Sequence, residues 1–426
     1  MSTVEAPAAA TAAGGMAGGV AVPILALALG HVFSNAVRTL PAVSADVLAA
    51  GLGVSADGLA AITSVFPAAF ALAMVPTGVA LDRYGVRRTA LALLAIGMLG
   101  SVLAALAGGA AGMAAAQAVL GVGCSGMLMC PVTFAARALP LRRFALWSGV
   151  IQAVGNTGML LSASPLALLV ERLGWRAGFW AAAGLALLAW TAVARLVPRP
   201  PALRPMRRTV WQDAREVLSL AGSPALRPLM VFAFASFAAV LGVRGLWGGP
   251  WLMEAKGLGR VEAGNVLLLS TVALTAGPAL AGLVDRWLGR SAALMAGSHM
   301  LVALLVLLLA AGGPGGPLAA LIGLPVLPPA FDAAVLALFG LVISFQVLIF
   351  PAARALVRPE QTGRALSAIN ISFFGGAAVM QAVSGAAASV AGIGAALCTF
   401  AFALLLCSAG FLALSRHAPR STHTAI

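Results

Sequence analysis

The sequence predicts an all-α membrane protein with twelve transmembrane helices in two pseudo-symmetric bundles of six. First, 61% of its 426 residues are hydrophobic and only 9% are charged, which is more apolar side chain than one soluble core can hide. Second, the apolar runs continue over about twenty residues, the length of a membrane-crossing helix, whereas the strands of a membrane barrel alternate over about ten. Third, the second half of the chain repeats features of the first.

Turn and charge signals divide each half into six apolar spans. The first six lie at about residues 20–39, 58–80, 89–108, 111–134, 146–169 and 177–196, and the second six at about 228–247, 262–284, 291–311, 331–351, 366–388 and 391–413. We therefore expect a disordered cytoplasmic tail (1–19), an N-terminal bundle (20–197), a cytoplasmic connector (198–227), a C-terminal bundle (228–413) and a second cytoplasmic tail (414–426). No Lys or Arg precedes Arg38, so the basic region of a cleavable signal peptide is missing.

Basic residues predict the orientation, because Lys and Arg are retained on the cytoplasmic side during insertion. With the N-terminus inside, twenty of the 26 Lys and Arg residues fall on the cytoplasmic side; the six outside are Arg38, Arg172, Arg176, Arg244, Lys256 and Arg260. If the number of spans were changed by one, the Lys and Arg residues would no longer gather on one side of the membrane. We expect a multi-pass protein of a bacterial-type inner (plasma) membrane with both termini in the cytoplasm.

The net charge of +14 is then a consequence of topology, with anionic membrane lipids as partners. A nucleic-acid-binding protein would gather its basic residues on a soluble face, so no nucleic-acid partner is expected. The four cysteines lie in apolar segments without CxxC spacing, which indicates neither a disulfide framework nor a metal site. No nucleotide-binding motif is present, and we expect no cofactor.

Two sequence segments recur at equivalent places in the two halves. The fourth span ends in FAARAL (134–139) and the tenth ends in PAARAL (351–356). Between spans two and three stands GVALDRYGVRR (78–88), and the matching place in the second half reads GLVDRWLGR (282–290). Such repeats of six spans build transporters from two bundles that move about a site at the membrane midplane.

The segment at residues 78–88 resembles the cytoplasmic loop of the major facilitator superfamily. The resemblance covers the whole chain through its layout of six plus six spans, and it implies the major facilitator fold and a secondary transporter that works by alternating access. The segments RTLP (38–41), GNTG (155–158) and RGLWGGP (244–250) are also loosely similar to nitrate/nitrite-porter-like and uncharacterised anion-porter members.

The resemblance also implies a cytoplasmic gate. Asp82 would accept hydrogen bonds from the start of a facing helix in the other bundle, the nearby arginines would bind lipid phosphate or a partner carboxylate, and the glycine would allow a sharp turn. The expected gating residues are Asp82, Arg83, Gly85, Arg87, Arg88 and, in the second copy, Asp285 and Arg286. The alternative is that they serve only as turn and topology residues.

Three departures from family patterns narrow the expected function. The fourth span has Gln117 where proton-coupled members carry an Arg before a Gly-x-Gly run, which argues against proton coupling through that Arg. The fifth span lacks the Gly-Pro-x-x-Gly pattern that resembles drug antiporters, which favours import over export. Spans two and eight lack the arginine of true nitrate porters, which argues against nitrate itself.

Few polar side chains lie at membrane depth, where an ionisable group costs about 3 kcal/mol or more and therefore indicates function. His31, Asn35 and Arg38 share one face of the first span at i, i+4 and i+7. Arg244 lies at a similar depth in the seventh span, and the two guanidinium groups facing each other would bind a carboxylate, sulfonate or phosphate. The amides expected to line the cavity are Gln152, Asn156, Asn370 and Gln381. The alternatives are that both arginines extend to the outer interface and that His31 is a core histidine.

The expected function is import of a small organic anion by a monomeric symporter or uniporter, with His31 as the main internal site for a coupling proton. Efflux of an amphipathic compound is an alternative. Copper uptake is another, because Cys124, Met127 and Cys130 share a helical face. Outside transport, the chain could be a membrane receptor. No zincin or nucleophile constellation is present, so we do not expect an enzyme.

Overall fold

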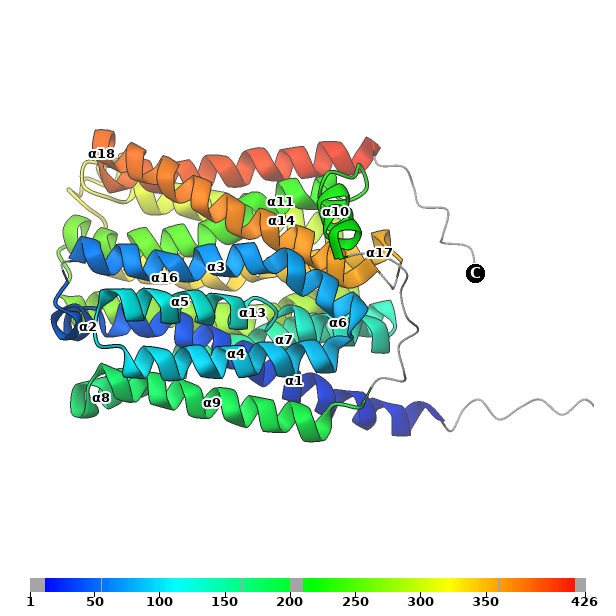
Figure 1. Ribbon diagram of the computed structural model, residues 1–426. Coiled ribbons are helices and arrows are strands. Elements are labelled where there is room, and N and C mark those ends of the chain that lie inside the picture. The colour runs from blue at the N-terminus through cyan, green and yellow to red at the C-terminus, as the bar shows by residue number, and fades with distance from the viewer. Residues whose placement is uncertain (1–11, 55, 162–163, 200–209, 359–360, 418–426) are drawn as a thin grey trace, which may run out of the picture.

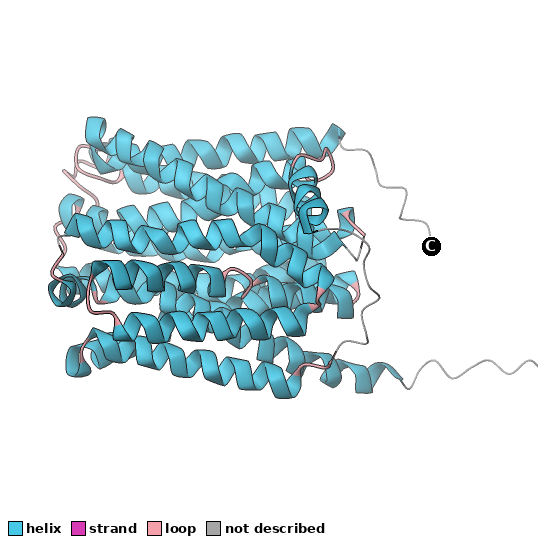
Figure 2. Ribbon diagram, in the orientation of Figure 1, coloured by secondary structure: helices cyan, strands magenta, loops and turns pink. Residues whose placement is uncertain are grey.

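The computed structural model describes residues 12–54, 56–161, 164–199, 210–358 and 361–417, and within these ranges the chain is helical with no strand (Figures 1 and 2). The expected all-α fold is therefore confirmed. The N-terminal bundle contains α1 (Ala12–Val43), α3 (Ala56–Arg83), α4 (Val86–Leu106), α5 (Ala110–Cys124) with α6 (Met129–Ala138), α7 (Leu141–Leu161) and α9 (Trp175–Leu196). Two short helices, α2 (Ala45–Leu52) and α8 (Ser164–Leu173), cap one end of it.

The C-terminal bundle repeats this arrangement after the connector helix α10 (Val210–Ala221). Its elements are α11 (Arg227–Ala239) with the π-helix η1 (Val240–Trp247), α12 (Gly248–Pro250) and the π-helix η2 (Trp251–Ala255), then α13 (Arg260–Leu288), α14 (Ser291–Ala311), α15 (Pro317–Leu321), α16 (Pro329–Ile343) with the 3₁₀-helix η3 (Ser344–Leu348) and α17 (Ile349–Leu356), and α18 (Thr362–His417). The contacts between the two bundles are most extensive along two helix pairs, α3 with α18 and α7 with α13.

The expected twelve transmembrane helices are present, although α18 contains two of them. Eleven helices of the described chain are long and apolar enough to cross a membrane, and one of these runs over 55 residues. Gly392 interrupts it with a φ of 78°, a conformation that residues with a Cβ rarely adopt. The chain reverses there, and the two arms of α18 return side by side (Figure 1).

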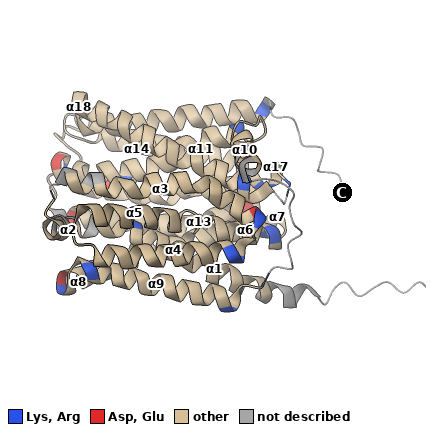
Figure 3. Cartoon of the chain, viewed as in Figure 1, with Lys and Arg blue, Asp and Glu red and all other residues tan. Residues whose placement is uncertain are grey.

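Charged residues are distributed unequally between the two ends of the bundle. The start of α1, the end of α18, α10 and α17 lie at one end, and α2 and α8 lie at the other (Figure 1). Figure 3 shows most of the Lys and Arg residues at the end where α10 and α17 lie. This distribution agrees with the division of Lys and Arg expected from the sequence.

One expected boundary needs correction. Residues 12–19, which we assigned to a disordered tail, belong to α1, because a helix already nucleated in the membrane span extends at little further cost per residue. The expected fifth span is described in two parts, α7 through Leu161 and α8 from Ser164, and residues 162–163 between them lie outside the described residues. Residues 1–11 of the expected tail lie outside the described residues.

Candidate functional site

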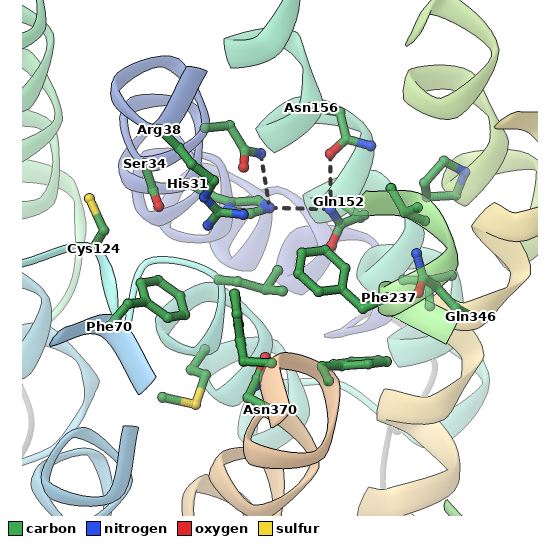
Figure 4. A pocket seen from close by; sticks show the side chains of 18 of the residues that line it. His31, Ser34, Arg38, Phe70, Cys124, Gln152, Asn156, Phe237, Gln346 and Asn370 are labelled. Carbon is green, nitrogen blue, oxygen red and sulfur yellow. Dashed lines mark hydrogen bonds between the residues drawn. The ribbon is translucent and has the colours of Figure 1, made fainter. Parts of the chain in front are cut away.

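A cavity of about 70 Å³ lies between the two bundles at the middle of the molecule (Figure 4). Helices α1, α3, α5 and α7 line it from the N-terminal side, and α11, η1, α13, η3, α17 and α18 line it from the C-terminal side. Its polar lining comprises His31, Ser34, Asn35, Arg38, Cys124, Ser125, Gln152, Asn156, Ser344, Gln346 and Asn370. Six of the eight residues expected from the sequence to bind substrate are therefore in one place.

Amides surround the imidazole of His31 on one wall of this cavity. The Nε2 atom of His31 lies 3.3 Å from Nε2 of Gln152 and 3.5 Å from Nδ2 of Asn35. Gln152 also donates to Oδ1 of Asn156 at 3.0 Å, and Asn156 donates to the carbonyl of Leu274 at 2.9 Å. The last bond crosses from α7 to α13, so the network joins the two bundles beside the cavity.

Arg38 extends into the cavity and packs against two phenylalanine rings. Its guanidinium carbon lies 5.4 Å from the ring centroid of Phe70 and 5.9 Å from that of Phe374, distances at which a cation is attracted to the ring face. The two rings belong to different bundles and their centroids are 4.4 Å apart. The Nε atom of Arg38 is buried without a hydrogen-bond partner, and none of the described residues that line the cavity is Asp or Glu.

A larger cavity of about 890 Å³ adjoins this site toward the end of the molecule where α2 lies. Arg38 and Phe374 line both cavities, so these two side chains separate them. Gln381, expected to bind substrate, lines the larger cavity and not the central one. Gln117, the residue at the position of the family's fourth-span arginine, also lines the larger cavity.

Arg244 departs from its expected position opposite Arg38. It donates through Nε to Oγ1 of Thr271 at 3.0 Å, within the C-terminal bundle, and lines neither of the two cavities. The cause is the π-helix η1 that contains Arg244, because the extra residue per turn changes the direction of the side chains that follow. The expected pair of facing arginines is therefore not formed in this structure, and Arg38 is the single Lys or Arg among the described residues that line the central cavity.

At the opposite end from the large cavity, Asp82 joins the two bundles. Oδ1 of Asp82 lies 2.6 Å from Nη2 of Arg137 in its own bundle, and Oδ2 accepts a hydrogen bond of 3.0 Å from Nε of Arg364 in α18. The backbone N–H groups of Gly363 and Arg364 donate to the same carboxylate at 3.3 and 3.2 Å. The contact to the start of a facing helix, implied by the resemblance, is present, and its role as a gate stays a prediction.

The connector extends this contact. Nη1 of Arg364 lies 2.5 Å from Oε2 of Glu216 in α10, and Gln361 donates to Oε1 of Glu216 at 2.7 Å. Arg364 therefore bridges a carboxylate of the N-terminal bundle and one of the connector. We call Asp82, Arg137, Glu216 and Arg364 the inner latch.

A family model for the major facilitator superfamily matches residues 24–352. The chain belongs to the major facilitator superfamily. Two uncharacterized MFS-type transporters, from two strains of Mycobacterium tuberculosis, are each 27% identical over 179 residues, which cover 41% of this chain and 26% of their own length. The match thus spans about a quarter of these relatives.

Solved structures of the superfamily show the same fold at low identity. The fucose:proton symporter FucP of E. coli superposes with a TM-score of 0.74 at 15% identity, covering 94% of this chain and 100% of FucP. FucP in the outward conformation gives a TM-score of 0.74 at 14% identity, with 95% and 100% covered. The human organic anion transporter MFSD10 gives 0.68 at 17% identity, with 92% and 98% covered.

The remaining residues of the superfamily's loop lie close to the inner latch. Gly85 has a φ of 80°, where any side chain would be strained, and precedes α4. Arg87 donates to the carbonyl of Ala194 in α9 at 2.7 Å, while Arg83 is half-buried at the end of α3 and Arg88 is exposed. Arg87 thus binds within its own bundle, and neither a lipid nor a partner carboxylate is needed to explain its position.

The second copy of the loop forms different contacts. Asp285 accepts a hydrogen bond of 2.6 Å from Oγ of Ser291, in the same bundle, and Arg286 is exposed. Here Arg354 crosses between the bundles, because Nη1 donates to the carbonyl of Leu139 at 2.7 Å and the guanidinium lies 5.1 Å from the ring centroid of Phe144. The hydrogen bond of Asp285 lies within its own bundle and does not support the second gate that the sequence predicts.

The sulfur-containing residues of the copper alternative are separated. Cys124 lines the central cavity, whereas Met127 and Cys130 are buried in the apolar core away from its lining. Within the described chain, no group of three or more His, Cys, Asp or Glu residues could hold a metal ion. The turn between α5 and α6 interrupts the regular helical face on which this alternative depended.

Sequence reasoning missed several residues of the site. Gln346 is an amide within an apolar span, the same signal that identified Gln152 and Asn370, so it could have been found. Arg364 and Glu216 gave no such signal, because charged residues in cytoplasmic segments are common and their pairing depends on the folded structure. Phe70 and Phe374 are indistinguishable by sequence from other apolar core residues.

Proposed function

We propose that this facilitator is a secondary transporter that imports a small organic anion across the bacterial inner membrane. The observation that carries the proposal is the guanidinium of Arg38, which lies in the central cavity with no acidic side chain among the described lining residues. A cation at membrane depth is expensive unless a partner compensates its charge. An anionic substrate supplies that partner, and the planar fork of the guanidinium suits a carboxylate.

The arrangement of the cavities supports binding from the outside. The large cavity at the α2 end leads to Arg38 and Phe374, while the inner latch joins the bundles at the α10 end. With both termini in the cytoplasm, this is an outward-facing conformation. The substrate would pass Arg38 and the two phenylalanine rings, enter the central cavity, and reach the cytoplasm after the bundles rock and the inner latch separates.

Two of the similar structures support parts of this proposal by their names. FucP is a fucose:proton symporter, which supports an ion gradient as energy source, and the human protein is an organic anion transporter. In this chain His31 is the cavity residue best suited to carry a coupling proton, because imidazole titrates near neutral pH when its environment permits. We further propose that the transporter is a monomer.

Uptake by purified protein in proteoliposomes tests the proposal. Each short carboxylate of a panel is loaded unlabelled into the liposomes and added outside in labelled form. A transported carboxylate should accumulate inside by counterflow, and Arg38→Met should abolish this accumulation. Labelled neutral sugars serve as the comparison, since the sugar symporters share the fold. Saturable counterflow of a sugar without counterflow of any carboxylate would overturn the proposed substrate class while leaving a transporter.

A further inference from the structure

Three buried polar atoms of the central cavity lack hydrogen-bond partners: Nδ1 of His31, Nε of Arg38 and Oε1 of Gln346. An unsatisfied buried polar atom costs about 1–3 kcal/mol, so three of them around one cavity indicate a ligand that satisfies them. His31 and Arg38 lie in α1 of the N-terminal bundle, and Gln346 lies in η3 of the C-terminal bundle. Figure 4 shows Gln346 across the cavity from Arg38.

The side of the cavity formed by α1 offers two donors. Nε2 of His31 faces the amide nitrogens of Gln152 and Asn35, both of which are donors, so Nε2 is the acceptor. The proton of the neutral imidazole then lies on Nδ1. An N–H of His31 and an N–H of Arg38, both without a partner, therefore belong to the same cavity, and each can donate to a carboxylate.

The side formed by η3 offers an amide and no charge. Gln346 presents an unpaired oxygen, which requires a donor, and the lining residues described contain no carboxylate that would compensate an ammonium group. A second anionic group would find no cation there, because Arg38 is the single Lys or Arg among those lining residues. A hydroxyl fits this side best, since it can donate and accept and so pairs with either end of the amide.

We infer that the transported anion is a short hydroxycarboxylate, with its carboxylate on Arg38 and His31 and its hydroxyl on Gln346. This inference rests on the proposed function and adds the second group of the substrate. The cavity of about 70 Å³ is small, which favours a short carbon chain. A molecule held by α1 at one end and by η3 at the other joins the two bundles, so its binding favours their closure around it.

Titration calorimetry on the purified protein tests this with matched ligand pairs in which a methyl group replaces the hydroxyl. The pairs are glycolate with propanoate and 3-hydroxypropanoate with butanoate. At least one hydroxycarboxylate should bind about tenfold or more tightly than its methyl partner, because a site built to pair a hydroxyl rejects an analogue that lacks it. Equal affinities within both pairs would overturn the inference and leave an anion transporter.

The Gln346→Met variant assigns the hydroxyl site. Methionine keeps the side-chain length without the amide, so the preference for the hydroxyl should fall to about twofold or less, while the methyl partner should keep its wild-type affinity and thereby show that the variant is folded. A tenfold preference that persists in Gln346→Met would overturn the assignment. If no carboxylate binds the wild-type protein and a neutral sugar does, the proposed function fails, and the inference fails with it.

Discussion

The guanidinium of Arg364 and the carboxylate of Asp82 lie 3.0 Å apart although they are 282 positions apart in sequence and belong to different bundles. Their side chains are only 6% and 3% exposed, so water screens the pair poorly. A bond of this kind exists only while the bundles are in contact at this end. We therefore expect the pair to stabilise one conformation of the transporter relative to the other.

The Asp82→Asn variant should weaken this preference. Asparagine fits the same space but loses the charge-assisted bond to Arg364 in the other bundle, which is worth about 1.5–3 kcal/mol, so the conformational equilibrium should shift by about ten- to a hundredfold toward the inward-open state. Uptake should slow while the protein still inserts. Initial uptake rates in proteoliposomes, normalised to the amount of reconstituted protein, measure the effect.

Asp285→Asn is the matched control for this variant. Asp285 occupies the equivalent place in the sequence repeat but accepts its hydrogen bond from Ser291 in the same bundle, so its loss should leave the uptake rate within about twofold of the wild type. Equal slowing by both variants would show that the carboxylates act on folding or topology. Wild-type uptake in Asp82→Asn would remove the inner latch as a gate.

Orientation in the membrane gives a second prediction. A reporter that is active only in the cytoplasm should work when fused after Gly222, between α10 and α11, because this end carries most of the basic residues. The same reporter should fail after Gly315, between α14 and α15, at the end where α2 lies. Activity of the Gly315 fusion in intact cells would contradict an orientation with both termini in the cytoplasm.

Sequence patterns predicted the fold well because the membrane allows few solutions. Apolar length predicts transmembrane helices, and the repeated AARAL segments correctly paired the fourth and tenth helices. The same repeat could not predict contacts. Arg137 binds Asp82 within its own bundle, whereas its counterpart Arg354 binds the carbonyl of Leu139 in the other bundle. The partner of each arginine depends on how the two bundles pack against each other, which neither repeat encodes alone.

The candidate site was predictable where helices are regular. The positions of His31, Asn35 and Arg38 follow from the α-helical period, and all three line the central cavity. The same reasoning failed for Arg244, because no sequence signal revealed the π-helical turns that direct its side chain to Thr271. The depth of a residue in a span predicts where its side chain points only when the number of residues per helical turn is known.

A buried ion pair in the C-terminal bundle gives a third prediction. Lys256 and Asp332 lie 2.8 Å apart with side chains that are 0% exposed, and Trp251 donates to the other carboxylate oxygen at 2.7 Å. Lys256→Met or Asp332→Asn alone should lower the free energy of unfolding by about 3–5 kcal/mol, because each leaves an uncompensated charge buried. Thermal unfolding in detergent measures this as a lower melting temperature.

The double variant Lys256→Met/Asp332→Asn controls for the individual changes. With both charges removed and the acceptor for Trp251 retained, it should be more stable than either single variant. Additive losses in the double variant would show that the two charges do not stabilise each other.

The last prediction separates the two arginines that the sequence grouped together. Arg38→Lys keeps a positive charge in the central cavity but removes the planar fork, so the affinity for the anion should fall by about 1.5–3 kcal/mol, or about ten- to a hundredfold. Arg244→Lys should leave that affinity within about twofold of the wild type, because Arg244 binds Thr271 and lines neither cavity; its defect should appear in stability. Concentration dependence of uptake, measured together with the amount of each variant in the membrane, distinguishes affinity from insertion.

A similar loss of affinity in both variants would restore the facing pair of arginines in the substrate-bound state. Near-normal affinity in Arg38→Lys would remove the reason for proposing an anion, and a neutral substrate bound by the amides of Gln152, Asn156 and Gln346 would then explain the polar lining better.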